Sequence, residues 1–311
     1  GSFGQVRLCW PHSSNDDRKF AVKVVDTKGA VYAHASSFIS ARQEASILKT
    51  VRHPHIVELV DVFEKERWLF LIMECVPGGE LFAALSDPKV PVSEGCIASV
   101  GRQLLQALRH LHERSIVHRD VKAENILLLT NPAKTSRWHI KLIDFGLATR
   151  VEQQPVCLFQ LCREQEVPIE QLICGTAYYC APEVWTNDYN PKVDVWAAGV
   201  VLYVLLTGDS PLQEGEIKFF SDPGSAEKAQ DVLAKALALN GNELDTACSK
   251  AVNLLRQLLV IDATKRVTAE QAIKHDFFDM EMSDRQLPRL SADPTQAIKR
   301  KTSFSSLSRR S

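Results

Sequence analysis

The chain has 311 residues and carries 37 Lys and Arg against 38 Asp and Glu, a net charge of −1. This length allows one large or two-lobed domain with a sizeable core, and the balanced charge gives no indication of binding to nucleic acid or to an anionic membrane. The longest apolar run, Val195 to Leu206, is too short to span a bilayer and predicts a buried helix.

The first 75 residues alternate short β-like runs with turns. One helical stretch, Phe38–Thr50, is predicted between them, because its apolar positions recur near the helical period. Strands are predicted at Gln5–Trp10, Lys19–Val25, Ile56–Glu64 and Trp68–Cys75.

From residue 79 onward the pattern is helical. Apolar residues between positions 97 and 111 recur at three- and four-residue steps, which predicts one buried face of a long helix. Shorter helices are predicted over Val252–Leu259 and over Thr268–His275, with Thr268 as the N-cap of the second. A β-rich part and a helical part, separated by Pro77-Gly78-Gly79, favour a cleft between two lobes, where ligands commonly bind.

Residues 281–311 contain few large apolar side chains and include two basic clusters, Lys299-Arg300-Lys301 and Arg309-Arg310, among serines. This composition predicts a flexible basic tail. The eight cysteines of the chain include no C-x-x-C pair. We therefore interpret them as small hydrophobic side chains of a protein in the reducing cytoplasm, with access to the nucleus left open.

A polar loop between two apolar β-like segments is the strongest candidate for a functional site. The loop His118–Asn125 carries six polar or charged residues between Ile116-Val117 and Ile126–Leu129, and burying so polar a loop costs desolvation energy unless it serves a site. Asp144 directly follows another apolar run, Ile140–Ile143. Asn125 and Asp144 carry oxygen ligands of the kind that Mg²⁺ prefers.

Other candidate residues are weak when each is considered alone. Gly1 and Gly4 would let a backbone approach a phosphate closely, but turns use glycine as often. Lys23 lies on a predicted strand, where a surface lysine of an edge strand is the alternative. Glu44 lies on the following helix and could pair with Lys23 or lie in solvent.

Taken together and in order, these residues resemble the protein-kinase signature. The resemblance runs from the first residue to about Phe278 and includes Ala181-Pro182-Glu183, Asp194-Val195-Trp196 and Arg266. It implies an α+β, two-lobed protein-kinase fold, with a small β-rich lobe at residues 1–77, a larger helical lobe at 78–280 and the tail at 281–311. Gly1 and Gly4 correspond to the second and third glycines of the phosphate-covering loop, so we expect an N-terminally incomplete fragment.

The resemblance implies a role for each residue of the polar loop. Asp120 would orient the substrate hydroxyl and accept its proton, and Lys122 would neutralise the transferring phosphoryl group. Asn125 and Asp144 would bind the Mg²⁺ ions that accompany ATP. Glu183 and Arg266 correspond to a buried structural ion pair of the family.

The resemblance also implies an ATP site. Lys23 would hold the α- and β-phosphates and be fixed by an ion pair to Glu44, and Met73 would guard the back of the adenine pocket. The other expected ATP contacts are the phosphate loop (Gly1, Gly4), the backbone partners of adenine (Glu74, Val76), the walls of the purine pocket (Val6, Ala21, Leu127) and a ribose contact (Glu80).

The expected substrates are serine and threonine hydroxyls of proteins, because Lys122 and Gly175-Thr176 are typical of serine/threonine kinases. Glu80 is expected to bind an arginine three residues before the acceptor, with ribose binding as the alternative. Glu124 would add a second acidic contact, and Thr176 would help to position the substrate. Within the family, the chain looks most similar to the calcium/calmodulin-dependent group, through Val51–Val57 and Pro77–Phe82, and we expect a monomeric domain.

Two segments bear on regulation. No Ser, Thr or Tyr lies between Arg150 and Cys174, so activation is predicted to need no phosphorylation there. Glu164, Glu166 or Glu170 could supply a standing negative charge opposite Arg119, and a solvated loop is the alternative. In the tail, Arg300 stands three residues before Ser303, which favours a segment that occupies the substrate groove or binds calmodulin or another regulator. A disordered end is the alternative.

Rival functions fit the sequence less well. A pseudokinase scaffold is disfavoured because Lys23, Asp120, Asn125 and Asp144 are all present. Phosphotransfer to a small molecule is disfavoured by Ala181-Pro182-Glu183. The sequence contains no calcium-binding loop of the D-x-[DN]-x-[DN]-G type. Two departures from the family pattern are Ala123, which replaces the usual proline, and Glu152–Ile173, which resembles nothing specific.

Overall fold

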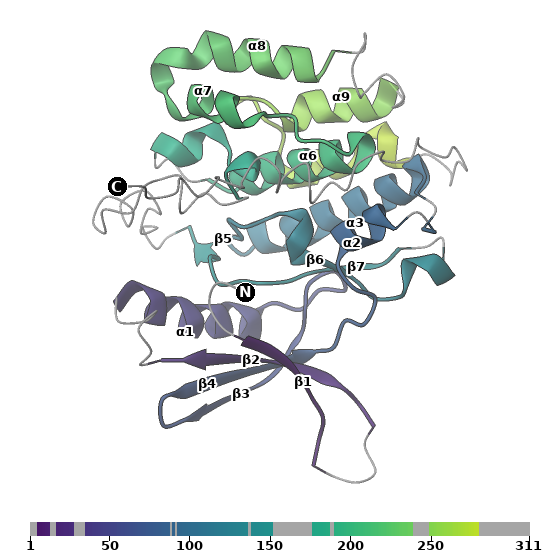
Figure 1. Ribbon diagram of the computed structural model, residues 1–311. Helices are drawn as coiled ribbons and strands as arrows, with labels where there is room; N and C mark the ends of the chain where they lie inside the picture. The colour runs from purple at the N-terminus through teal and green to yellow at the C-terminus, as the bar shows by residue number, and fades with distance from the viewer. Residues whose placement is uncertain are drawn as a thin grey trace, which may run out of the picture.

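The computed structural model describes residues 5–12, 17–27, 35–87, 89–90, 92–135, 138–151, 176–186, 190–238 and 249–279. Figure 1 shows a small sheet with one helix beside it, joined to a larger stack of helices. The predicted α+β, two-lobed architecture is confirmed. The predictions for Gly1 and Gly4, for the acidic residues of segment 152–175 and for the tail lie outside the described residues.

The sheet of the small lobe has four antiparallel strands in the order β1-β2-β4-β3. Helix α1 (Ala35–Thr50) packs the small side chains of Ala41 and Ala45 against Val25, Leu69 and Leu71 of this sheet. The predicted helix and all four predicted strands are present, at β1 (Gln5–Cys9), β2 (Phe20–Asp26), β3 (Leu59–Lys65) and β4 (Trp68–Glu74).

The predicted start of the third strand, Ile56, is wrong by three residues, because β3 begins at Leu59. The backbone N–H of Val57 donates to the carbonyl of Leu142 at 3.0 Å, and Ile56 forms an isolated bridge to the same residue. Both side chains are buried. Their apolar character therefore reflects docking of this loop on the large lobe rather than membership of β3.

The large lobe is built around two helices that pack on each other, α3 (Glu94–His112) and α6 (Lys192–Thr207). Every residue of α6 from Val193 to Leu206 is buried, so the predicted core helix is confirmed. It ends at Gly208, whose φ of 79° lies in the left-handed region that glycine tolerates best. No helix among the described residues is long and apolar enough to cross a membrane.

Shorter elements surround these two helices. Thr268 forms the predicted N-cap, as part of a capping box with Gln271. The two small sheets pair β5 with β8 and β6 with β7. The elements are α2 (Leu81–Ser86), β5 (Ile116–Val117), β6 (Ile126–Leu128), β7 (Ile140–Leu142), β8 (Thr149–Arg150), α7 (Ile217–Ser221), α8 (Ala226–Ala236), α9 (Ser249–Leu258) and α10 (Ala269–Ile273).

Candidate active site

Strand β2 and helix α1 bring a lysine and a glutamate together at the junction of the lobes. Lys23 Nζ donates to Glu44 Oε1 at 2.9 Å and to Oε2 at 2.8 Å, and both residues are buried. The same nitrogen donates to Asp144 Oδ1, from the large lobe, at 2.9 Å. Lys23 therefore connects both lobes, and the expected ion pair to Glu44 is present.

Lys23 and Asp144 stabilise each other's charges, whereas burial, with a contribution from Asp144, raises the pKa of Glu44. Burial alone would lower the pKa of Lys23, but the carboxylates of Glu44 and Asp144 raise it above its ordinary value. Burial likewise opposes ionisation of Asp144, and the charge of Lys23 nevertheless holds the pKa of Asp144 below its usual range. Lys23 is thus a cation and Asp144 an anion at neutral pH.

The polar loop after β5 forms a second cluster. Lys122 Nζ donates to both carboxylate oxygens of Asp120 at 2.8 Å, and Asn125 Nδ2 donates to Asp120 Oδ2 at 2.8 Å. Asn125 lies in a short 3₁₀ helix, Ala123–Asn125. The three expected catalytic side chains are therefore in direct contact.

A buried aspartate on α6 fixes the shape of this loop. Asp194 accepts hydrogen bonds from the backbone N–H groups of His118 and Arg119, at 2.9 Å each, and contacts His112 Nε2 at 2.9 Å. Burial opposes its ionisation, but these partners lower its pKa. Arg119 has a φ of +64°, a costly conformation that persists at such sites because the surroundings hold it. The sequence motif around Asp194 was visible, but this anchoring role was not.

The turn Asp144-Phe145-Gly146 follows β7 and lies against the polar loop. The backbone N–H of Ile143 donates to the carbonyl of Asn125 at 2.9 Å. Phe145 is fully buried, with its ring edge-on to that of His118 at 4.7 Å. Asp144 has a φ of +60°, and its side chain keeps 27% exposure. These contacts hold Asp144 and Asn125 on two neighbouring turns of the large lobe.

The donor set at Asn125 and Asp144 fits Mg²⁺ held together with a nucleotide. Asn125 uses its amide nitrogen for the contacts to Asp120, which leaves its amide oxygen as a ligand. Within the part of the chain that the structure describes, no group of three His, Cys, Asp or Glu side chains could hold an ion alone. Mg²⁺ typically takes one or two carboxylates plus substrate phosphates, so this small oxygen set suits it.

The residues expected around adenine share one region. Ala21 pairs with Met73 across β2 and β4, and Leu127 on β6 forms an isolated bridge to Glu80. Val6 on β1 is 59% exposed. The backbone N–H of Glu74 donates to the carbonyl of Glu58, so Glu74 can offer adenine only its carbonyl.

The expected substrate carboxylates lie near each other. Glu80 is exposed at the start of α2, and Glu124 is half-buried in the 3₁₀ helix of the polar loop. Burial raises the pKa of Glu124, and the negative charges of Asp120 and Glu80 add to this effect. Thr176 begins the 3₁₀ helix Thr176–Tyr179, and its side chain lies outside the described residues.

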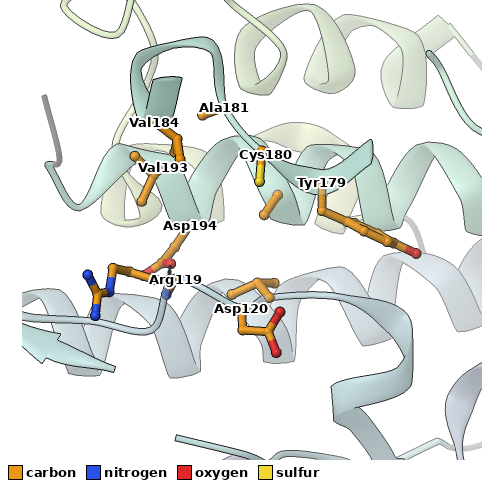
Figure 2. A pocket seen from close by; sticks show the side chains of 10 residues that line it. Arg119, Asp120, Tyr179, Cys180, Ala181, Val184, Val193 and Asp194 are labelled. Atoms are coloured by element: carbon orange, nitrogen blue, oxygen red, sulfur yellow. Dashed lines mark hydrogen bonds between the residues drawn. The ribbon is translucent and has the colours of Figure 1, made fainter. Parts of the chain in front are cut away.

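A small cavity of about 40 Å³ lies beside Asp120 (Figure 2). Tyr179 and Cys180 approach it from one side, and Asp120 and Arg119 from the other. Burial, followed by the charge of Asp120, raises the pKa of the Cys180 thiol to about 12, so this thiol stays protonated and unreactive. Sequence inspection did not single out Tyr179 or Cys180, because neither carries a distinctive pattern.

The expected structural ion pair is also present. Arg266 Nη1 and Nη2 donate to Glu183 Oε1 and Oε2 at 2.5 and 2.9 Å, and Arg266 is 1% exposed. This ion pair joins the 3₁₀ helix Pro182–Thr186 to the residues that precede α10.

A lysine–glutamate pair thus lies opposite an aspartate-bearing loop in a two-lobed fold. The family model for the protein kinase domain matches residues 1–278. The chain belongs to the protein kinase family.

Similar proteins agree with this assignment. The chain is 34% identical over 276 residues to the Calcium/calmodulin-dependent protein kinase type II alpha chain of Drosophila melanogaster, covering 88% of this chain and 47% of that protein. It is 35% identical over 287 residues to Serine/threonine-protein kinase DCLK3 of Mus musculus, covering 90% of this chain and 32% of that protein. The chain thus spans less than half the length of these relatives, and the predicted similarity to the calcium/calmodulin-dependent group is confirmed.

A solved structure shows the same fold. The autoinhibited serine kinase domain of the giant muscle protein titin superposes with a TM-score of 0.74 at 25% identity, covering 97% of this chain and 85% of that chain.

Proposed function

We propose that this domain is a catalytically active serine/threonine protein kinase that uses ATP and Mg²⁺. One observation carries the proposal: the Lys23–Glu44–Asp144 cluster and the Asp120–Lys122–Asn125 cluster are assembled at the same time. A scaffold without catalysis has no need of both. The serine/threonine kinases among its relatives support the same conclusion.

Each residue has a role that follows from its position. Lys23 would bind phosphate oxygens and be kept in place by Glu44. Asp120 would accept a hydrogen bond, and then the proton, from the acceptor hydroxyl, while Lys122 offsets negative charge beside it. Asn125 and Asp144 would hold Mg²⁺, which offsets the charge of the phosphates. Most of the catalytic effect would come from positioning and electrostatics.

The test is transfer of the γ-phosphoryl group from ATP to a serine peptide with upstream arginines, by the full-length protein. Wild type should phosphorylate the peptide, and Asp144→Asn should not, while both melt at similar temperatures. A matched control is Asp87→Asn, because Asp87 is exposed just after α2. A wild-type protein that binds ATP and Mg²⁺ yet phosphorylates nothing across a peptide library would favour the scaffold.

We further propose a preference for arginine three residues before the acceptor. Glu80 forms a bridge to Leu127, three residues after Glu124, so the two carboxylates provide a site of negative charge that suits a guanidinium group. Glu80→Ala should reduce the advantage of arginine at this position on a peptide array, and Glu227→Ala on α8 should not. If Glu80 bound the ribose instead, Glu80→Ala would raise KM for ATP and leave the peptide preference unchanged.

We also propose that the tail, residues 281–311, regulates the enzyme by competing for the peptide groove. Its basic clusters complement the acidic residues Glu80 and Glu124, and tethering raises the effective concentration to the order of millimolar. Deleting residues 291–311 should lower KM for the peptide and leave KM for ATP unchanged. Tight binding of a tail peptide to calcium-loaded calmodulin would identify the releasing partner. Unchanged kinetics together with no phosphate at Ser303 would leave a disordered end.

A cytoplasmic location is proposed on the basis of cysteine chemistry. The described cysteines Cys9, Cys75, Cys96 and Cys180 are free thiols, which is usual in a reducing compartment. Fluorescence microscopy of a tagged full-length protein tests this, and a signal confined to a secretory compartment would contradict it.

A further inference from the structure

Helix α1 is tied to the chain just after the Asp144-Phe145-Gly146 turn. Gln43 Nε2 donates to the carbonyl of Ala148 at 3.1 Å and to Oγ1 of Thr149 at 3.2 Å. Neither the kinase motifs nor the roles proposed above involve Gln43. It is nevertheless the immediate neighbour of Glu44, the residue that holds Lys23.

Thr149 is well placed to receive this contact. It is 5% exposed, and its hydroxyl both accepts from Gln43 and donates to the carbonyl of Arg150 at 3.5 Å. As the first residue of β8, Thr149 pairs with Val117 of β5. Strand β5 leads directly into the loop that carries Asp120. The Gln43–Thr149 contact thus connects α1 with the strand that positions that loop.

Helix α1 packs unevenly along its length. Its last turn buries Ile47 and Leu48 in the main core, but next to Gln43 it meets the sheet through two alanines, Ala41 and Ala45, which bury little apolar surface. Successive helical residues point about 100° apart, so one helix can direct Glu44 into the cleft and Gln43 toward β8. The rotation that places Gln43 on Thr149 is the rotation that places Glu44 on Lys23.

We propose that Gln43 and Thr149 form a latch that holds α1 in the position where Glu44 reaches Lys23. Both are positioning residues, since neither touches the reacting groups. The inference rests on the proposed function, because it assumes that the Lys23–Glu44 pair supports phosphotransfer. Two ordinary hydrogen bonds shift a conformational equilibrium by roughly tenfold, which is the size of effect that the latch should have.

The kinetic test is a double-mutant cycle on the full-length protein. Gln43→Ala should lower kcat for peptide phosphorylation roughly tenfold, with KM for the peptide unchanged. Thr149→Val should have a smaller effect, because Gln43 keeps the carbonyl of Ala148 as a partner. Thr149→Ser should retain activity, because it keeps the hydroxyl. In the double variant the losses should be less than additive, since both changes remove one contact.

The matched control is Arg42→Ala. Arg42 precedes Gln43 on α1, but its guanidinium pairs with Glu64 on β3, at 2.5 Å, and both side chains are about half exposed. This variant should keep wild-type kcat. Equal kcat values for Gln43→Ala, Arg42→Ala and wild type, or fully additive losses in the cycle, would overturn the latch.

Hydrogen–deuterium exchange gives a readout that does not depend on activity. Gln43→Ala should speed amide exchange in both residues 41–50 and residues 147–150, and Arg42→Ala should not speed exchange in 147–150. If wild type transfers no phosphate, the proposed function fails, and this exchange pattern still decides whether the latch exists. Unchanged exchange at both segments in Gln43→Ala would overturn it.

The latch gives Thr149 a role opposite to that of an activating phosphorylation site. A negative charge there would have to be buried where the hydroxyl now contacts Gln43 and the carbonyl of Arg150, at a desolvation cost. Thr149→Glu should therefore lose more kcat than Thr149→Val. Activity of Thr149→Glu at or above wild type would contradict this role.

Discussion

Two buried ion pairs among the described residues, Arg266–Glu183 and Lys23–Glu44, each join a cation to a carboxylate but are held in different ways. Arg266 donates hydrogen bonds to both carboxylate oxygens of Glu183 and to the carbonyls of Val260 and Lys192. Its guanidinium lies 5.1 Å from the ring centre of Trp196. All of these partners belong to the large lobe.

Lys23 has a different set of partners. Its ammonium group donates to Glu44, on α1, and to Asp144, on the turn after β7 in the other lobe. Asp144 is partly exposed. The partners of Lys23 thus come from two lobes and are side chains, whereas those of Arg266 come from one lobe and include two backbone carbonyls. Burial alone therefore does not distinguish a structural pair from one that we propose to act in catalysis. The two pairs differ in where their partners come from.

The largest expected effect is on the structural pair. Arg266→Met leaves Glu183 as a buried charge without its cation, and breaking such a pair typically costs about 3–5 kcal/mol. Thermal unfolding should show a strongly lowered midpoint, with loss of soluble protein. The control is Lys265→Met, because the neighbouring Lys265 forms only an exposed pair with Asp262. A melting temperature equal to that of the control would show that Arg266 is dispensable for the fold.

Lys23→Met should act on activity instead of stability. Removing one preorganised charge from a catalytic site costs roughly a hundred- to a thousandfold in rate. Burial raises the pKa of Glu44, so without Lys23 this side chain can take up a proton instead of remaining a buried charge, and the melting temperature should fall less than in Arg266→Met. Peptide phosphorylation and thermal unfolding, measured on the same samples, check this contrast. Equal destabilisation by the two substitutions would remove the distinction between the pairs.

A smaller loss of stability is expected on acidification, and it should come from a histidine cluster between the lobes. The rings of His53 and His55 lie 5.4 Å apart, and those of His53 and His110, on α3, 4.9 Å apart. Burial, then the neighbouring cations, lowers the pKa of His53 to about 4 and also lowers the pKa values of His55 and His110. The other charged groups facing this cluster are Arg109, Glu113, Arg114, His139 and Lys141.

The sign of this pH effect follows from linkage. The unfolded chain binds protons at these histidines from about pH 6.5 downward, while the folded protein resists protonation until a lower pH, so stability falls as the pH falls through this window. Melting temperatures at pH 7.5 and pH 5.0 measure the loss, and His53→Asn should make it smaller. A loss of the same size in His53→Asn would place the effect elsewhere, for instance at the buried His118.

The smallest expected effect is that of phosphatase treatment. Arg119 already donates from Nε to the carbonyl of Leu147 at 2.6 Å, and segment 151–173 contains no hydroxyl residue. Enzyme made in bacteria and treated with phosphatase should therefore keep most of its activity in a peptide assay. Loss of nearly all activity, with a phosphate mapped to Thr149 in the untreated enzyme, would refute both this prediction and the inhibitory role of a charge at Thr149.

The sequence by itself determined the family and the order of the elements, and it supplied most residues of the candidate site. Local patterns sufficed for this: Thr268 as an N-cap, the apolar run of α6, and a polar loop between two short strands. Such features need only near neighbours in the chain, because capping and helical periodicity act over three or four residues.

Only the tertiary structure decided how these pieces meet. It placed Gln43 on Thr149, 106 positions along the chain, and made Asp194 the anchor of a loop 75 positions before it. It also moved Ile56 and Val57 from the predicted strand to the face of β7. The physical reason is the same in each case. The sequence shows that an apolar or amide side chain needs a partner. Only the packing of distant segments determines which partner it contacts.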